Sequence, residues 1–577
     1  MKWTILFLCA TALAQEFDLI LANGRLVDGS GNAWYRADIG IRQDRIQAIG
    51  SLQTRTARRK LDVAGMIVAP GFIDMMGASS EPLLDDPSAA ESKLRQGITT
   101  LLAGEGSSIA PSEKWPTFSA YFQALENKGI ALNVVHNVGA AQVRRMVIGV
   151  ENRAPSSAEL DRMRALVDQA MKDGAVGLST ALIYPPGTYA ATSEIVELAK
   201  VAAKHGGIYL THMRNESHAV LDAIRESIGI GEAARLPVHI FHLKAAGEEN
   251  WPRMREAIDA IQAARSRGLD VTADIYPYIR NGIGLGSFLH PRHYGRGAAA
   301  FLPTLRDPQV RGALRQEVES TSDWENWYRH VGRNWDNVLV AQVGATVEKR
   351  FEGKSVAAIA RLRGVDEWTT FFDLAATGEI SVNPKSMNEE QKHLALRTEW
   401  VSVCTDAPPV AIAKASGAHP RAFGSFPRVL AKYVREEKTI SLENAIRKMS
   451  SLAANRLGLF DRGRIAIGLA ADLVIFDPEK IQDRASFEQP LQFPEGMPYV
   501  IVNGALAIEN GRFVQARSGR ILKWRTLQDA AVGFSPRRVE TRGTLKLAPL
   551  QTARRWNHGS ASAPSADESG LHAESRR

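Results

Sequence analysis

Val176-Gly-Leu-Ser-Thr180, Ile208-Tyr-Leu-Thr211 and Val238-His-Ile-Phe241 are short apolar runs at regular intervals in the middle of the chain. Each has the length and composition of a buried strand, and amphipathic stretches separate them. Strands that alternate with helices are typical of a parallel sheet covered on both faces. This stretch therefore decides the fold class, which is α/β.

The same pattern extends in both directions and gives eight candidate strands, as a closed (β/α)₈ barrel of the TIM type requires. The best-defined helix follows Pro155, where Ser156 and Glu159 have the spacing of a capping box and Gly174 marks the end. The candidate strands are Ile67–Ile73, Thr99–Leu102, Leu132–Val138, Val176–Thr180, Ile208–Thr211, Val238–Phe241, Val271–Ile275 and Val401–Thr405.

Short strand-like segments joined by Asn-Gly or Asp-Gly turns flank the barrel pattern at both ends of the chain. Because two such sets enclose one long middle, we expect a single small β-sandwich made from both terminal segments. Its parts would be residues 15–66 and 466–525, with the barrel at 67–465.

Two other regions depart from the alternating pattern. The interval from about 280 to 399 contains Trp324, Trp327 and Trp335, and we interpret it as an insertion that could cover the mouth of the barrel. Residues 530–577 are rich in Ser, Ala, Arg and Pro, which is typical of a disordered tail.

The N-terminus has the features of an export signal. Lys2 precedes an apolar stretch, Thr4–Leu13, and the small-x-small sequence Ala12-Leu-Ala14 predicts cleavage near Ala14. The apolar stretch is shorter than the roughly 20 residues of a bilayer-spanning helix. We therefore expect an exported protein, periplasmic or extracellular, without a membrane anchor.

Composition narrows the function classes. Of 577 residues, 45% are hydrophobic and 23% charged, as in ordinary globular proteins. The net charge of +8 is scattered rather than gathered in a basic stripe, so nucleic acid is not an expected partner. Once the signal is removed, Cys404 is the sole cysteine, which excludes a disulfide framework and favours a buried apolar role.

Four residues with metal or proton chemistry follow candidate strands. Glu105 comes after the second strand, His212 after the fifth, His242 at the end of the sixth and Asp406 after the eighth. A single histidine or aspartate there is usually a hydrogen-bonded rim residue or a helix cap. All four meet on one rim of a barrel, however, and that convergence favours a metal site.

Two imidazoles and a carboxylate suit zinc in its catalytic form, with three protein ligands and one open position. A nearby carboxylate that is not a ligand can accept a proton from the water at that position. The sequence thus predicts a hydrolytic centre with zinc held by Glu105, His212 and His242, and with Asp406 as the base.

With these motifs in place, the chain resembles the N-acyl-D-amino-acid deacylases (D-aminoacylases) of the amidohydrolase superfamily, from about Phe17 to Leu522. Some of the matching segments are general to the superfamily, and others are more particular to the deacylases. They include Val68-Ala-Pro-Gly-Phe-Ile-Asp74, Gly174-Ala-Val-Gly-Leu-Ser-Thr-Ala-Leu-Ile-Tyr184, Thr211-His-Met-Arg214, Ile275-Tyr-Pro-Tyr278 and His419-Pro-Arg421.

The resemblance implies a barrel with a β-sandwich and a small-molecule N-acyl amino acid as substrate. It assigns metal binding to the two histidines and to Glu105, and the general base to Asp406. It places Lys244, a tyrosine such as Tyr276, and Arg421 near the substrate carboxylate. Surface charge or packing explains those last three residues equally well.

One departure from the family pattern concerns the residues after the first strand. The superfamily usually has His-x-His there, whereas this chain has Met76 and Ala78 at those positions. A thioether is a poor zinc ligand and alanine is none, so we expect one zinc rather than two. Gly177-Leu-Ser-Thr180 also lacks a lysine that could bridge two metals.

Two alternatives stay open at this point. The same fold could hydrolyse another amide, as a dipeptidase or a lactamase-type enzyme does. It could also serve as a catalytically impaired binding protein, although a site without catalytic activity would have no reason to keep three metal ligands and a base. Metal analysis separates the second alternative from an enzyme.

Overall fold

The computed structural model describes residues 15–321, 323–415 and 417–524. The predicted export signal, residues 1–14, and the predicted tail, residues 530–577, lie outside this part of the chain, and both stay predictions. Within the described residues, no helix combines the length and apolar character that crossing a bilayer would need.

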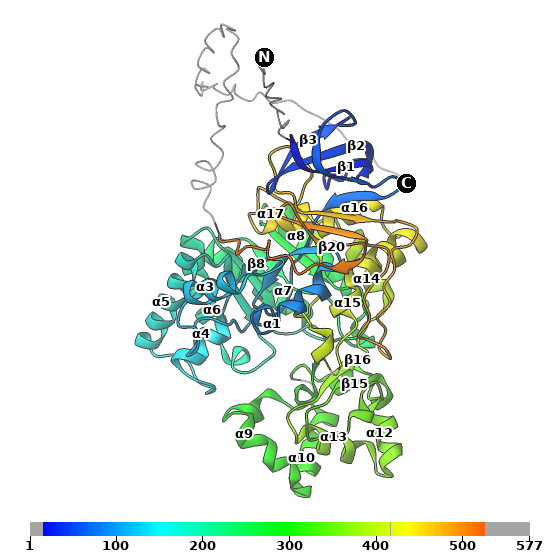
Figure 1. Cartoon of the computed structure of the whole chain (residues 1–577). Helices are drawn as coiled ribbons and strands as arrows, with labels where there is room; N and C mark the ends of the chain where they lie inside the picture. The colour runs from blue at the N-terminus through cyan, green and yellow to red at the C-terminus, as the bar shows by residue number, and fades with distance from the viewer. Residues whose placement is uncertain (1–14, 322, 416, 525–577) are drawn as a thin grey trace, which may run out of the picture. The chain divides into compact units, whose positions relative to one another are not determined.

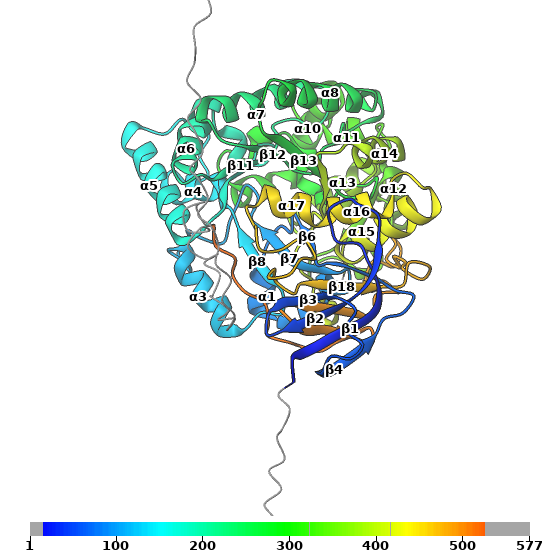
Figure 2. The same cartoon turned by 90° about the horizontal axis from the view of Figure 1, so that it is seen from above.

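The central strands form the predicted parallel barrel. Neighbours follow the chain order from β6 to β8 and from β9 to β17, and only Asn137 separates β8 from β9. Figure 2 shows helices α6, α7 and α8 outside strands β11, β12 and β13. The strands are β6 (Phe72–Asp74), β7 (Ile98–Ala103), β8 (Asn133–His136), β9 (Val138–Gly139), β10 (Gly177–Ala181), β11 (Ile208–His212), β12 (Val238–Ile240), β13 (Val271–Ile275) and β17 (Val401–Val403).

The helices of this region are α1 (Glu81–Asp85), α2 (Glu91–Leu94), α3 (Phe118–Lys128), α4 (Ala140–Val147), α5 (Ser157–Asp173), α6 (Thr192–Lys204), α7 (Val220–Ala234), α8 (Arg253–Ser266), α14 (Glu389–Arg397), α15 (Arg421–Arg428), α16 (Leu442–Met449) and α17 (Ser451–Arg456). The helix expected after Pro155 is α5. Ser156 and Glu159 form its capping box, and Gly174 ends it in the left-handed conformation.

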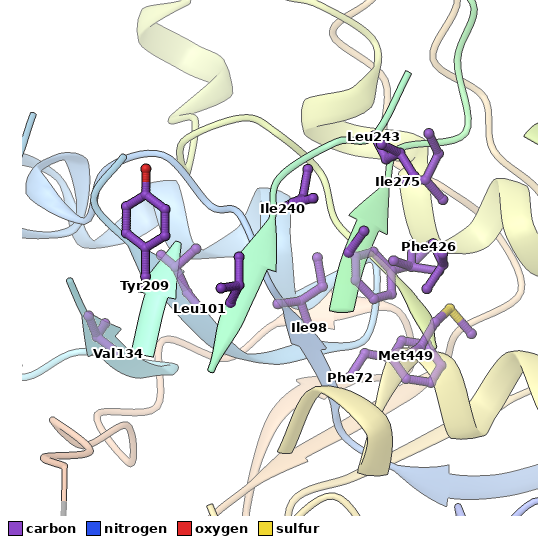
Figure 3. Packing of buried hydrophobic residues seen from close by; sticks show 14 of the residues in the cluster. Phe72, Ile98, Leu101, Val134, Tyr209, Ile240, Leu243, Ile275, Phe426 and Met449 are labelled. Atoms are coloured by element: carbon purple, nitrogen blue, oxygen red, sulfur yellow. The ribbon is translucent and has the colours of Figure 1, made fainter. Parts of the chain in front are cut away.

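Alternate residues of the barrel strands pack into two separate apolar layers. Leu101 and Ile240 belong to the layer beneath the helices, which Figure 3 shows together with Tyr209 and Phe72. Their chain neighbours Leu102 and Phe241 belong to a second cluster. Successive side chains of a strand point to opposite faces, so this second cluster fills the barrel interior. Both faces are buried, which explains the continuous apolar runs in the sequence.

The first candidate strand, residues 67–73, proves to be two strands in different sheets. Residues up to Pro70 pair with the terminal sheet, and Phe72–Asp74 pair with β7 of the barrel. The break is at Gly71, where an added Cβ would lie only 2.2 Å from Oγ1 of Thr99. The sequence showed one apolar run because both halves are fully buried.

The sequence predicts one small β-sandwich made from both terminal segments, and strands from both ends of the chain do join, in one nine-stranded sheet. β18 from the C-terminal segment pairs with β5 from the N-terminal segment. The Asn23-Gly24 turn signal predicts separate strands at Phe17–Leu21 and Arg25–Val27, but the structure has one strand there, β1, with a bulge between Leu21 and Gly24. The strands are β1 (Phe17–Leu26), β2 (Tyr35–Arg42), β3 (Arg45–Gly50), β4 (Ala57–Asp62), β5 (Ile67–Pro70), β18 (Leu473–Phe476), β19 (Tyr499–Val502), β20 (Ala505–Glu509) and β21 (Arg512–Phe513).

The segment between β13 and α14 has a sheet and a core of its own, and its helices appear together in Figure 1. Trp324, Trp327 and Trp335 are all buried in that core. We call residues 283–384 the insertion, because α14 packs against α8 and β13 of the barrel. Its elements are β14 (Ile283–Gly284), α9 (Ala298–Phe301), α10 (Pro308–Ser320), α11 (Trp327–His330), β15 (Val338–Gln342), α12 (Val356–Arg363), α13 (Glu367–Ala375) and β16 (Ser381–Pro384).

A buried polar cluster joins the first barrel strand to the last. The ammonium of Lys93 donates to Oδ2 of Asp74 at 2.9 Å, to Oγ1 of Thr405 at 2.6 Å and to the carbonyl of Ala407 at 2.7 Å. Asp74 also accepts from the backbone N–H of Thr405. All three lysine protons are therefore used at the point where β6 meets β17.

Replacing Lys93 with methionine should lower the free energy of unfolding by about 3–5 kcal/mol, because Asp74 would remain buried without its counter-ion. Denaturant unfolding measures this change. Lys172, which pairs with Asp168 and is 60% exposed, provides the matched control, and Lys172→Met should cost less than about 1 kcal/mol. Equal losses for the two variants would contradict the role of Lys93.

Candidate metal centre

Four predicted site residues lie at the carboxyl ends of barrel strands. Glu105 follows β7, His212 ends β11, His242 follows β12 and Asp406 follows β17. His242 and Asp406 have positive φ angles of 36° and 50°. Such left-handed backbone is uncommon outside glycine and concentrates at functional sites.

Three of these residues bring donor atoms to one point. Oε1 of Glu105 lies 2.9 Å from Nδ1 of His212 and 3.5 Å from Nε2 of His242. The three residues form a group whose donor atoms all lie within 4.8 Å of one another, and no other such group occurs among the described residues. Both imidazoles are buried, whereas the side chain of Glu105 is 25% exposed. The arrangement leaves an approach for a further ligand.

The charges in this group depend strongly on one another. Burial disfavours ionised Glu105, but bonds and charges from His212 and His242 outweigh it and hold the pKa of Glu105 below its usual range. Burial likewise opposes a charged His212, yet the carboxylates of Glu216 and Glu105 raise its pKa to about 10. A metal that binds here competes with protons for the imidazole nitrogens.

Glu216 is a central residue of the site to which sequence reasoning assigned no role. Its carboxylate lies 3.4 Å from Nε2 of His212 and 3.1 Å from Nδ1 of His242. These nitrogens are the ones that face away from Glu105. A carboxylate on the outer nitrogen fixes the orientation and tautomer of a metal-binding histidine. The sequence feature that could have indicated a role for Glu216 is its position four residues after His212.

Asp406 faces the same centre and is held by Arg421, whose Nη1 lies 2.6 Å from Oδ2. Burial raises the pKa of Asp406 above its ordinary value, and the positive charges of Arg421 and His242 limit the rise. Asp406 is not part of the three-residue donor group. A carboxylate with a raised pKa beside a metal site is suited to accepting a proton.

The three residues predicted to bind the substrate carboxylate have different surroundings in the structure. The ammonium of Lys244 donates to Oε1 of Glu216 at 2.6 Å and lies 2.7 Å from Nδ1 of His242. Tyr276 is fully buried against Arg421, whose guanidinium carbon lies 4.7 Å from the ring centre. The tyrosine at the metal centre is Tyr184, which stacks edge-on against His212. Arg421 is thus the best placed of the three for an incoming carboxylate.

Met76 and Ala78 bring no metal donor to the centre. Met76 is 2% exposed and belongs to the apolar cluster that fills the barrel interior, together with Leu102, Phe241 and Cys404. Ala78 packs against the same cluster. Both positions therefore carry apolar side chains within this cluster.

Three neighbouring cavities meet at the centre. The metal cavity, of about 60 Å³, is lined by the donor group, Glu216, Lys244, Asp406 and Arg421. The apolar cavity, of about 450 Å³, shares Tyr184 and Trp327 with it. Its other lining residues include Ile183, Leu285, Leu289, Leu302, Trp324, Leu374 and Ile380. The apolar cavity is within the size range of small-molecule sites. The third cavity, of about 590 Å³, shares Tyr184, Asp406 and Arg421 with the metal cavity.

Comparison with known proteins gives consistent matches. The model of the amidohydrolase family matches residues 60–508. A D-aminoacylase of Alcaligenes xylosoxydans xylosoxydans is 34% identical over 88% of this chain and 98% of that protein. An N-acyl-D-glutamate deacylase of the same organism is 33% identical over 91% of this chain and 99% of that protein.

Solved structures show the same likeness. The N-acyl-D-glutamate deacylase from Bordetella bronchiseptica, complexed with zinc and a phosphonate inhibitor, superposes with a TM-score of 0.76 at 30% identity, covering 88% of this chain and all of that one. A D-aminoacylase superposes with a TM-score of 0.74 at 31% identity, with the same coverage. That structure is described as a binuclear centre with one-metal activation and second-metal attenuation.

Replacing His242 with alanine should weaken zinc binding by more than the 10- to 100-fold typical of residues that only support a ligand. Competition with a chromophoric chelator measures the dissociation constant. His205→Asn is the control, because His205 pairs with Asp168 outside the centre. Unchanged zinc affinity in the His242 variant would remove this residue from the site.

Proposed function

Because the chain belongs to the amidohydrolase family and is a metal-dependent hydrolase of carbon–nitrogen bonds in linear amides, we propose that it deacylates N-acyl-D-amino acids with a single zinc ion. The observation that carries the proposal is the convergence of Glu105, His212 and His242 beside Asp406. The preference for D-amino acids rests on the named relatives.

The donor set fits zinc. Two imidazoles and a carboxylate are a common set for a catalytic zinc, and the outer nitrogens of both imidazoles already face Glu216. Glu105, His212 and His242 would hold the ion. Bound there, zinc would supply Lewis acidity to the acyl carbonyl and lower the pKa of a water.

Asp406 provides the proton transfer, and Arg421 binds the substrate carboxylate. Asp406 accepts a proton from the attacking water and returns it to the leaving nitrogen, for which its raised pKa suits it. Arg421 holds Asp406 in place and presents its remaining donors to the carboxylate of the substrate. Lys244 pairs with Glu216, and its ammonium keeps further donors for the same carboxylate.

We propose one zinc rather than two because Met76 and Ala78 offer no ligands. The D-aminoacylase described as activated by one metal and attenuated by a second supports this proposal. This chain keeps one donor set, and apolar side chains stand at the positions of the His-x-His pair. The site is therefore suited to a single ion.

The apolar cavity favours substrates with large apolar side chains over acidic ones. Among the described residues that line it, Arg145 is the one cation, and it is exposed to solvent. Glu325 also lines the cavity, and burial followed by the charge of Glu216 raises its pKa to about 8. An acidic side chain would find no buried counter-charge there.

With zinc supplied, N-acetyl-D-leucine and N-acetyl-D-phenylalanine should be hydrolysed with kcat/KM about 100-fold or more above N-acetyl-D-glutamate and N-acetyl-D-aspartate. The reason is that an unpaired carboxylate in an apolar cavity costs several kcal/mol. Release of free amine is the measurement, and the L-enantiomers are the controls. Equal rates for acidic and apolar substrates would refute the assignment of the cavity, and no turnover of any substrate would refute the deacylase proposal.

Asp406→Asn should lower kcat by about 10²–10⁴-fold, because the amide cannot accept the proton. Metal analysis should still find about one zinc per chain, since Asp406 is outside the donor group. Asp323→Asn, a change at a 66% exposed aspartate of the insertion, is the control and should leave kcat unchanged. An Asp406→Asn variant with normal activity would end the proposed role of Asp406.

A further inference from the structure

The geometry points to Glu325 of the insertion as a positioning residue for the zinc centre, acting through Glu216. This inference rests on the zinc part of the proposed function and concerns how the site is held together. It makes the insertion a structural part of the metal centre as well as a wall of the substrate cavity.

The first step is the position of Glu216, which is 1% exposed. Its carboxylate contacts the outer nitrogens of His212 and His242 and the ammonium of Lys244. A displacement of Glu216 would therefore change the surroundings of both imidazoles at once. Such supporting contacts typically contribute 10- to 100-fold to metal affinity.

The second step is what holds Glu216 itself. Its carbonyl accepts from the backbone N–H of Ala246, in the loop after β12, at 2.6 Å. Its backbone N–H donates to the Oε1 atom of Glu325, a residue of the insertion. The barrel thus holds Glu216 on one side and the insertion holds it on the other.

The third step is a second contact of the insertion with the site, through His330. A Cβ added to Gly247 would lie 3.3 Å from the Cα of His330, so α11 abuts the loop that follows His242. Nδ1 of His330 also lies 3.5 Å from the Oε2 atom of Glu325. Residues 325–330 therefore meet the loops that follow β11 and β12, the two strands whose ends carry the histidine ligands.

Trp327, in the same short segment, lines both the metal cavity and the apolar cavity. This segment of the insertion therefore lies at the boundary between the two cavities.

Two substitutions at Glu325 separate this role from general stability. Glu325→Gln keeps an acceptor for the N–H of Glu216, so its zinc dissociation constant should stay within about twofold of the unmodified chain. Glu325→Leu removes the acceptor from a buried N–H and should weaken zinc binding about 10-fold. Chelator competition on the metal-stripped full chain measures both constants.

Glu317→Leu is the matched control. Glu317 is a glutamate of the same insertion with a side chain that is 9% exposed, and its ion-pair partners Arg292 and His293 belong to the insertion as well. Its loss should lower the unfolding midpoint without changing the zinc dissociation constant. Wild-type zinc affinity in Glu325→Leu, or equal weakening in Glu317→Leu, would overturn the inference.

Hydrogen exchange at the amide of Glu216 in the metal-free chain gives a second measurement, independent of zinc and of hydrolysis. Exchange should be faster in Glu325→Leu than in Glu325→Gln, and Glu325→Ala replaces the leucine variant if that variant does not fold. Equal exchange rates would overturn the inference. Failure of the unmodified chain to bind zinc would instead refute the proposed metal function and leave the exchange result to decide on Glu325.

Discussion

Lys93 and Asp74 form a fully buried ion pair where the first barrel strand meets the last. Two charges removed from water are tolerated only when their hydrogen bonds are complete, and here Thr405 and Ala407 complete those of Lys93. The backbone N–H of Asp406 donates to the carbonyl of Met76 directly beside this pair. The closure of the barrel and the position of the proposed base therefore depend on the same contacts.

The donor group depends on a second buried carboxylate, that of Glu216. It lies between the outer nitrogens of both histidines and the ammonium of Lys244, so three positively polarised groups share one anion. The insertion contacts the backbone N–H of Glu216 through Glu325. A segment that the barrel pattern does not require thus contributes both to the substrate cavity and to the metal-binding side chains.

Much of the fold and part of the site could be predicted because they follow from local pattern. The alternating strands, the capping box at Ser156 and the Asn503-Gly504 turn each depend on residues close in sequence. Glu105, His212, His242 and Asp406 could be placed on one rim because parallel strands end on the same side of a barrel. The division of residues 67–73 could not be predicted, since both halves are apolar and only their pairing partners differ.

The sequence by itself determined the fold class, the family resemblance, the rim that carries the chemistry and the absence of histidines at positions 76 and 78. Tertiary structure alone decided that Glu216 supports both imidazoles, that Tyr184 rather than Tyr276 lines the metal cavity, and that the insertion reaches the centre through Glu325. The physical reason is distance along the chain. A strand end can be located from its own residues, whereas a contact such as that between Glu216 and Glu325 joins segments 109 residues apart and exists only once the core has packed.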